Sequence, residues 1–157
     1  MSVANPHRPP MSPEQTLKAV DRTLKAAKCL IDSEYHGQGI ARSYYGVHLL
    51  VTLLLRLSST SPQGMASASS KRLIHSSIPD CVSDLYGAFP STASARLNSL
   101  DAERLADELY NQRIVADYYG YGDPGAPIAK RLHSRATDIC LDLTDEVKRI
   151  TTRKPVI

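Results

Sequence analysis

Three polar residues in the C-terminal half of the chain are spaced so that they would share one face of a helix. Tyr110, Arg113 and Asp117 lie three and four residues apart, and residues at these intervals are neighbours on a helix surface. Asp117 can pair with the Arg113 guanidinium, and the planar fork of donors on that guanidinium could also grip a phosphate. The spacing alone leaves two interpretations open, a ligand site or an ion pair that orders the end of the helix.

A second group of candidates lies earlier in the chain. Arg42 and His48 are six residues apart, which turns a helix by about 240° and sends the two side chains in different directions. Tyr44 and His48 are four apart and could share a hydrogen-bonded position, either in the core or beside Arg113. A histidine satisfied within the core is the simpler interpretation.

Metal and cofactor chemistry has no sequence signature here. The five histidines stand singly, without the close spacing of a zinc or iron site: His7, His36, His48, His75 and His133. The sequence has neither a glycine-rich phosphate loop nor a Gly-x-Ser-x-Gly turn. We therefore expect no bound metal and no cofactor.

Composition favours one globular domain in a reducing compartment. The chain has 157 residues and 42% hydrophobic residues, enough for a continuous core. Three widely separated cysteines argue against a disulfide framework, and no apolar run approaches the roughly 20 residues that span a bilayer. We expect a cytoplasmic protein without membrane contact, and its net charge of +3 is compatible with an anionic partner.

Hydrophobic periodicity predicts helices throughout. Ser12, Pro13 and Gln15 form a helix start with a capping box, and an apolar stripe follows until Gly37 and Gly39, which we expect to end this first helix. A second helix over 40–57 is apolar on nearly every face, so it should lie at the centre of a bundle or at a subunit interface.

The rest of the chain continues this pattern. Residues 58–70 are serine-rich and predict a mobile loop, and a helical stretch over 70–89 should be interrupted at Pro79. A further helix should follow the 90–99 connection, with Asp101 in its first turn, and end near 118–125. Pro127 should open a last helix with a long apolar stripe. The expected class is all-α, with a flexible tail at 1–11, one helical domain at 12–150 and a second tail at 151–157.

Three short motifs, in order along the chain, resemble those of the HEPN family (higher eukaryotes and prokaryotes nucleotide-binding). The first helix carries Leu24-Lys25-Ala26-Ala27-Lys28-Cys29-Leu30, similar to Leu-x-Ala-Ala-x-x-Leu. Arg42-Ser43-Tyr44-Tyr45-Gly46 resembles the Arg-Ala-Tyr-Tyr-Ala element of one HEPN branch. Arg113-Ile114-Val115-Ala116-Asp117-Tyr118 is similar to its Arg-x-x-Ala-Asp-Tyr signature.

The resemblance implies an up-and-down bundle of four to five helices that forms a homodimer. Many HEPN proteins are metal-independent ribonucleases of prokaryotic toxin–antitoxin or defence systems, and some pair with a nucleotidyltransferase-like antitoxin. By this resemblance Arg113, Asp117 and Tyr118 are the candidate catalytic residues. The candidate substrate-binding residues are Arg42, Tyr45, His48 and Tyr110.

The chain departs from the family at its nuclease mark, an arginine followed after four to six residues by histidine. Tyr118 and Tyr119 stand where that histidine would fall, and the next histidine is His133. RNA transphosphorylation needs a group that moves protons near neutral pH. We therefore expect an RNA-binding HEPN-like protein with cleavage left open. The alternative is a catalytically degenerate HEPN module that binds a protein partner, an antitoxin or another effector, in a larger complex.

Overall fold

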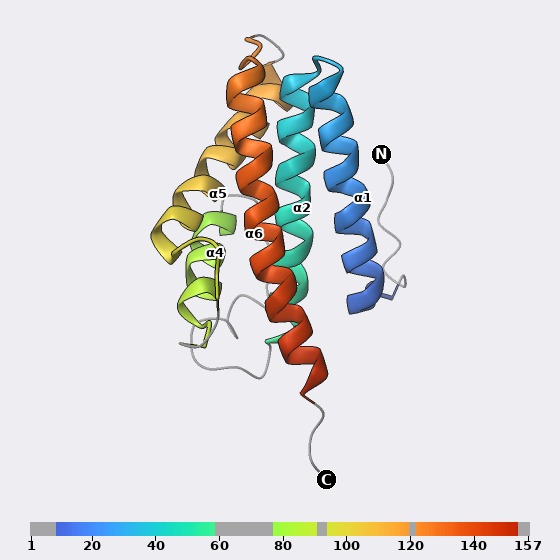
Figure 1. Ribbon diagram of the computed structural model, residues 1–157, viewed down its shortest axis with the longest axis vertical. Helices are drawn as coiled ribbons and strands as arrows, with labels where there is room; N and C mark the ends of the chain where they lie inside the picture. The colour runs from blue at the N-terminus through green and yellow to red at the C-terminus, as the bar shows by residue number, and fades with distance from the viewer. Residues whose placement is uncertain (1–8, 59–76, 91–93, 120–121, 154–157) are drawn as a thin grey trace.

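Helices make up all the regular structure of the described residues. The computed structural model describes residues 9–58, 77–90, 94–119 and 122–153, without the side chains of 118 and 119. Its elements are α1 (Pro13–Asp32), α2 (His36–Leu57), α4 (Ile78–Gly87), α5 (Ser99–Ile114), the π-helix η2 (Val115–Tyr119) and α6 (Ala126–Thr152) (Figure 1). The predicted all-α class is confirmed.

The start of α1 follows the predicted capping box. The Gln15 N–H donates to the Ser12 hydroxyl oxygen at 3.1 Å, and the Ser12 N–H donates to the Gln15 side-chain oxygen at 3.0 Å. These two bonds satisfy backbone donors that a helix start otherwise leaves without partners. Pro13 occupies the first turn, where its missing N–H costs nothing.

The predicted end of the first helix was wrong. α1 stops at Asp32, the chain turns at Glu34 with a φ of 67°, and Gly37 and Gly39 lie inside α2. Gly39 serves close packing, because a Cβ there would come within 2.3 Å of Cγ1 of Ile31 on α1. Gly39 therefore lets the antiparallel helices α1 and α2 approach each other, a role that a single-helix pattern does not reveal.

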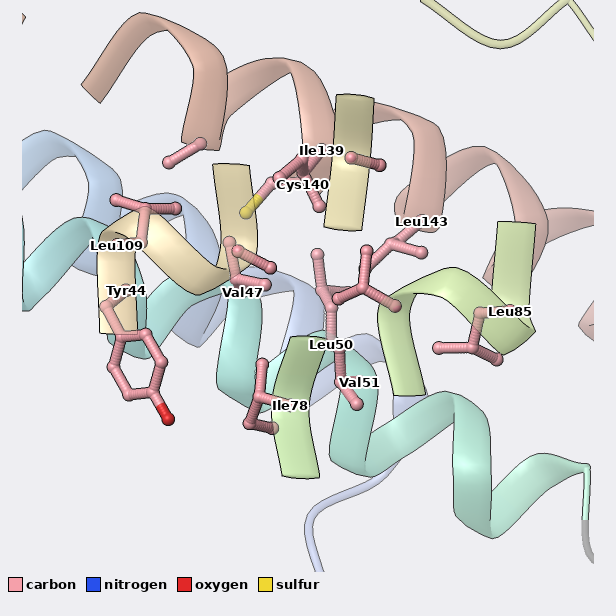
Figure 2. Close-up of a cluster of buried hydrophobic side chains, with 14 of the residues drawn as sticks. Tyr44, Val47, Leu50, Val51, Ile78, Leu85, Leu109, Ile139, Cys140 and Leu143 are labelled. Carbon is pink, nitrogen blue, oxygen red and sulfur yellow. The ribbon is translucent and has the colours of Figure 1, made fainter. Parts of the chain in front are cut away.

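α2 is the central helix of the bundle, as its apolar sequence predicted. It packs against α1, α4, α5, η2 and α6, and Figure 1 shows it between α1 and α6. Tyr44, Val47 and Leu50 are fully buried and meet Leu109 of α5 and Leu143 of α6 in the shared core (Figure 2). One core therefore unites the helices.

Two later helices also begin close to where the sequence placed them. Pro79 lies in the first turn of α4, so a short helix starts at the predicted break, and residues 70–76 of the predicted stretch lie outside the described residues. Nearly all of the predicted 58–70 loop falls outside the described residues. The Asn98 side chain caps α5 by accepting the Asp101 N–H at 2.8 Å.

A buried carboxylate fastens the α4–α5 connection to α6. Asp142 accepts the Tyr86 hydroxyl at 2.7 Å, the Arg96 N–H at 2.9 Å and the Leu97 N–H at 3.2 Å. Burial, followed by the hydrogen bond to Asp142, raises the pKa of the Tyr86 hydroxyl. Both oxygens of Asp142 are satisfied, as a buried charge requires.

α6 is the longest helix and continues to Thr152, two residues beyond the predicted domain end. Pro127 lies in its first turn, as expected. Its apolar stripe is buried except at Ile128, which is 38% exposed. In the described part of the chain, no helix is long and apolar enough to cross a bilayer.

Candidate functional site

Arg113 is the buried cation of the bundle end formed by α2, α5 and η2. It lies in the last turn of α5, is 7% exposed, and donates from Nε to Oδ2 of Asp117 at 3.1 Å. Its Nη2 donates to the Tyr45 hydroxyl of α2 at 3.3 Å. The Arg113–Asp117 pair predicted from spacing therefore exists, and a residue from a second helix completes it.

Tyrosine rings enclose the guanidinium. Cζ of Arg113 lies 5.5 Å from the ring centroids of both Tyr44 and Tyr45, which is within cation–π range. The Tyr44 ring is in turn 6.1 Å from the rings of Tyr110 and His48, centroid to centroid. Through Arg113 and Tyr44 the structure thus links five of the seven predicted site residues into one cluster: Tyr45, His48, Tyr110, Arg113 and Asp117.

The surroundings of Arg113 keep it charged. Burial by itself would lower the pKa of the guanidinium, but the Tyr45 hydrogen bond and the nearby Tyr45 and Asp117 groups outweigh it, so the pKa is raised. Burial also raises the pKa of the Tyr44 hydroxyl well above its ordinary value. Tyr44 is therefore a packing partner of the cation and no proton acceptor near neutral pH.

The π-helix η2 carries Asp117. α-Helical geometry ends at Ile114, and residues 115–119 form a wider turn. Such turns are rare and occur frequently at functional sites. Here the Arg113–Asp117 bond spans the junction between the two helix types. The third predicted catalytic residue, Tyr118, belongs to η2, but its side chain lies outside the described part of the structure.

Arg42 is the predicted residue that the structure does not bring into this cluster. Its side chain is exposed on α2, and it makes no hydrogen bond or ion pair with any other described residue. His48 is partly buried and packs on Tyr44, and no hydrogen bond joins it to Arg42 in the described residues. This agrees with their expected divergence along a helix.

A second polar pair near η2 was missed by sequence reasoning. Nδ1 of His36, the first residue of α2, lies 2.8 Å from Oδ1 of Asp123, which also accepts the Gly125 N–H at 2.8 Å. Eighty-seven positions separate the two residues, so no helical spacing could have joined them. The only sequence signal was an isolated histidine among glycines.

No family model, curated protein or solved structure shows a significant match to this chain. Among the described residues, no three His, Cys, Asp or Glu side chains gather closely enough to hold a metal ion. What the site offers chemically is a fixed guanidinium, a carboxylate, tyrosine rings and, next to them, a carboxylate-bound imidazole.

Proposed function

We propose that this chain is a HEPN-like RNA-binding protein of a prokaryotic toxin–antitoxin or defence system, that it works as a homodimer, and that Arg113 is its phosphate ligand. One observation carries this proposal: a buried guanidinium, fixed by residues of two helices, stands beside a π-helical turn in the segment that resembles the family signature. An exposed ion pair contributes only about 0–1 kcal/mol to the free energy of unfolding. An ion pair with that role alone would require neither a buried arginine nor a π-helix.

The geometry suggests how a phosphate would enter. Tyr45 and the tyrosine rings hold the guanidinium from α2, whereas Asp117 approaches it from the side of η2. The Asp117 side chain is 36% exposed, so its carboxylate can turn towards water and leave its place to a phosphate oxygen. Arginine then offers the phosphate charge-assisted hydrogen bonds from a planar fork.

This exchange gives a sharp test, because Asp117 and the RNA phosphate compete for one cation. Binding of a fluorescent single-stranded RNA would be measured in excess EDTA for the wild type, Arg113→Lys, Arg113→Ala and Asp117→Asn. Loss of the guanidinium should weaken binding by about tenfold to a hundredfold, the value of a hydrogen bond to a charged group. Asp117→Asn should strengthen binding several-fold, since the competing charge is gone.

Arg22→Ala is the matched control. Arg22 is an exposed residue of α1. This helix packs mainly on α2 and α6, whereas Arg113 lies on α5. The loss of Arg22 removes the same charge and should lower affinity only through general attraction to the RNA backbone. Circular dichroism and sedimentation would show that each variant keeps its helices and its oligomeric state. Equal losses in Arg22→Ala and Arg113→Ala would contradict the proposal.

A second candidate function is the degenerate HEPN module that binds a protein partner. It is favoured by the fact that Nε and Nη2 of Arg113 already have acceptors within the chain, so the cation does not require an external anion. Under this alternative the wild type would bind no RNA at all. It would instead form a stable complex with the product of a neighbouring gene, for instance a nucleotidyltransferase-like antitoxin.

A further inference from the structure

Four arginines line a groove between α5 and α6. The groove has a volume of about 420 Å³ and is formed by the segment that leads into α5, by α5 itself and by the first half of α6. No described lysine lines it. Its arginines are Arg96, Arg104, Arg131 and Arg135.

This groove is separate from the Arg113 site. Arg104 and Arg113 are nine residues apart on α5, which corresponds to about two and a half turns of a helix and places their side chains on opposite sides of it. Arg113 is buried and meets Tyr45 of α2, whereas Arg104 is exposed. Neither Arg113 nor Asp117 lines the groove, so a ligand bound there would use a different set of cations.

Two of the four guanidinium groups are available to an external anion. Arg104 is exposed and makes no hydrogen bond or ion pair with another described residue. Arg135 reaches only Asp138, at 3.6 Å, and its side chain is 51% exposed. An exposed ion pair of this length is weak, so Arg135 can exchange Asp138 for an anion from solution.

The other two arginines are held in place by carboxylates. Nη1 of Arg96 donates to Oδ1 of the buried Asp142 at 3.1 Å and to Oδ2 of Asp145 at 3.2 Å. Arg131 of α6 donates from Nη1 to Oε2 of Glu108 on α5 at 3.2 Å, and from Nη2 to the other oxygen of the same carboxylate. A guanidinium has five N–H donors, so both side chains keep donors for a ligand.

The charge of the lining favours an anionic ligand. Beside the four arginines, the groove is lined by two carboxylates, those of Asp101 and Glu108, so positive charge is in excess. Arginine binds phosphate oxygens through pairs of parallel hydrogen bonds. A nucleic-acid strand carries one charge on each nucleotide and can therefore neutralise several spaced arginines at once, which is the contact that dominates its affinity for proteins.

The apolar lining argues against a protein segment as the ligand. Leu97 is buried and Leu105 is half-buried. The groove therefore exposes little of the apolar surface that forms the core of a protein–protein interface. A polar, arginine-rich groove of this kind fits a sugar–phosphate backbone better than an acidic peptide.

We propose that the α5–α6 groove binds the backbone of single-stranded RNA, with Arg104 and Arg135 as its main phosphate ligands. This inference rests on the proposed RNA-binding function and adds to it a second contact that is independent of Arg113. Phosphate contacts position a nucleic acid without reading its sequence. The groove should therefore contribute equally to the binding of different RNA sequences, and its contribution should fall as the salt concentration rises.

The salt dependence of RNA binding tests this role. Binding of a fluorescent single-stranded RNA to the full chain would be measured between about 50 and 200 mM salt, for the wild type and for Arg104→Ala/Arg135→Ala. Each phosphate contact with a single strand contributes about 0.7 to the slope of log affinity against log salt concentration. The double variant should bind more weakly, with a slope that is smaller by about 1.4.

Arg22→Ala/Lys25→Ala is the matched control. It also removes two exposed positive charges, but from α1. Arg22 has no partner among the described residues, like Arg104, and Lys25 pairs with the exposed Asp21, as Arg135 does with Asp138. The slope of this variant should stay close to that of the wild type. Circular dichroism would show that both double variants keep their helices.

Glu108→Gln provides a test in the opposite direction. It removes a negative charge from the groove and releases Arg131, so it should strengthen RNA binding several-fold, a gain that loss of folding cannot produce. A wild-type slope in Arg104→Ala/Arg135→Ala, an equal reduction in the α1 control, or weaker binding by Glu108→Gln would overturn the role of the groove. If Arg113→Ala still lost RNA binding in that case, the proposed function would stand. Absence of RNA binding by the wild type would overturn both.

Discussion

Arg113 and His36 show two ways in which a polar side chain is accommodated inside this helical bundle. Arg113 donates hydrogen bonds to Asp117, four residues later in the same helical segment, and to Tyr45 of α2. His36 depends on one carboxylate from a distant connection. A buried polar group needs such partners because it otherwise loses the free energy of its hydration. In both cases the partner also fixes the orientation that a ligand would meet.

His133 illustrates the opposite case, a histidine that burial keeps neutral. Desolvation and the nearby Lys28 lower its pKa, while Asp32 acts in the other direction. The unfolded chain, with a histidine pKa of about 6.5, then binds more protons than the folded chain in mildly acidic solution. We expect the free energy of unfolding to fall as the pH drops below about 6.5 towards the folded-state pKa. Urea denaturation across this range measures it.

His133→Gln is the corresponding control variant. A glutamine can still bond to Ser43 but does not titrate, so the slope of stability against pH between about 5 and 6.5 should become smaller. Carboxylates dominate only at lower pH. An unchanged slope in the variant would show that another group causes the acid sensitivity.

The sequence predicted the site contact between residues that are close in the chain, but not the contacts between residues that are far apart in it. Arg113 and Asp117 were paired from their spacing, because a helix brings i and i+4 together. Tyr45 was a candidate only through the family resemblance, and its contact with Arg113 depends on how α2 and α5 pack. His36 and Asp123 belong to neither case. Their meeting depends on the path of the connection between η2 and α6, for which no periodicity exists.

At the scale of elements, the α1–α2 packing depends on Gly39. A Cβ there would lie 2.3 Å from Cγ1 of Ile31 and 3.1 Å from the Ala27 carbonyl oxygen. Gly39→Ala gains helix propensity, worth up to about 1 kcal/mol, but it must push α1 away or strain Ile31, and overpacking costs about 1–3 kcal/mol. We expect a net loss of stability, measured by the urea midpoint.

Gly87→Ala provides the comparison. Gly87 closes α4, and an added Cβ would meet no atom within 4 Å. The same chemical change should therefore stabilise the protein by about 0.4–1 kcal/mol, mainly by restricting the unfolded chain. If the two alanine variants shifted stability in the same direction, close helix packing at Gly39 would not be the reason for that glycine.

Helix starts were easier to predict than helix ends or irregular turns. Ser12 and Gln15 predict the start of α1 because the capping box is a hydrogen-bond pattern between residues close in sequence. The end of α1 at Asp32 was missed, since Gly37 and Gly39 resemble helix terminators and their actual contacts lie on a neighbouring helix or on η2. The π-turn at Val115–Tyr119 was not expected either, since its side-chain pattern differs little from that of an α-helix.

For the whole molecule, the apolar pattern of α2 predicted the architecture. A helix that is apolar on nearly every face must be surrounded, and α2 contacts all the other described helices. Leu50 and Leu54 are fully buried at its centre. Because the described helices share one core, loss of the packing around α2 should unfold all of them together. This central position makes a single cooperative unfolding transition the expected behaviour.

Leu50→Ala tests this expectation directly. Truncation of a fully buried leucine costs about 2–5 kcal/mol, and it should lower the urea midpoint equally in far-UV circular dichroism, which reports helix, and in the near-UV tyrosine signal, which reports packing. Leu100→Ala, at a position that is 54% exposed, should change stability by no more than about 0.5 kcal/mol. Separate midpoints for the two signals would mean that part of the bundle, α1 for example, unfolds independently of α2.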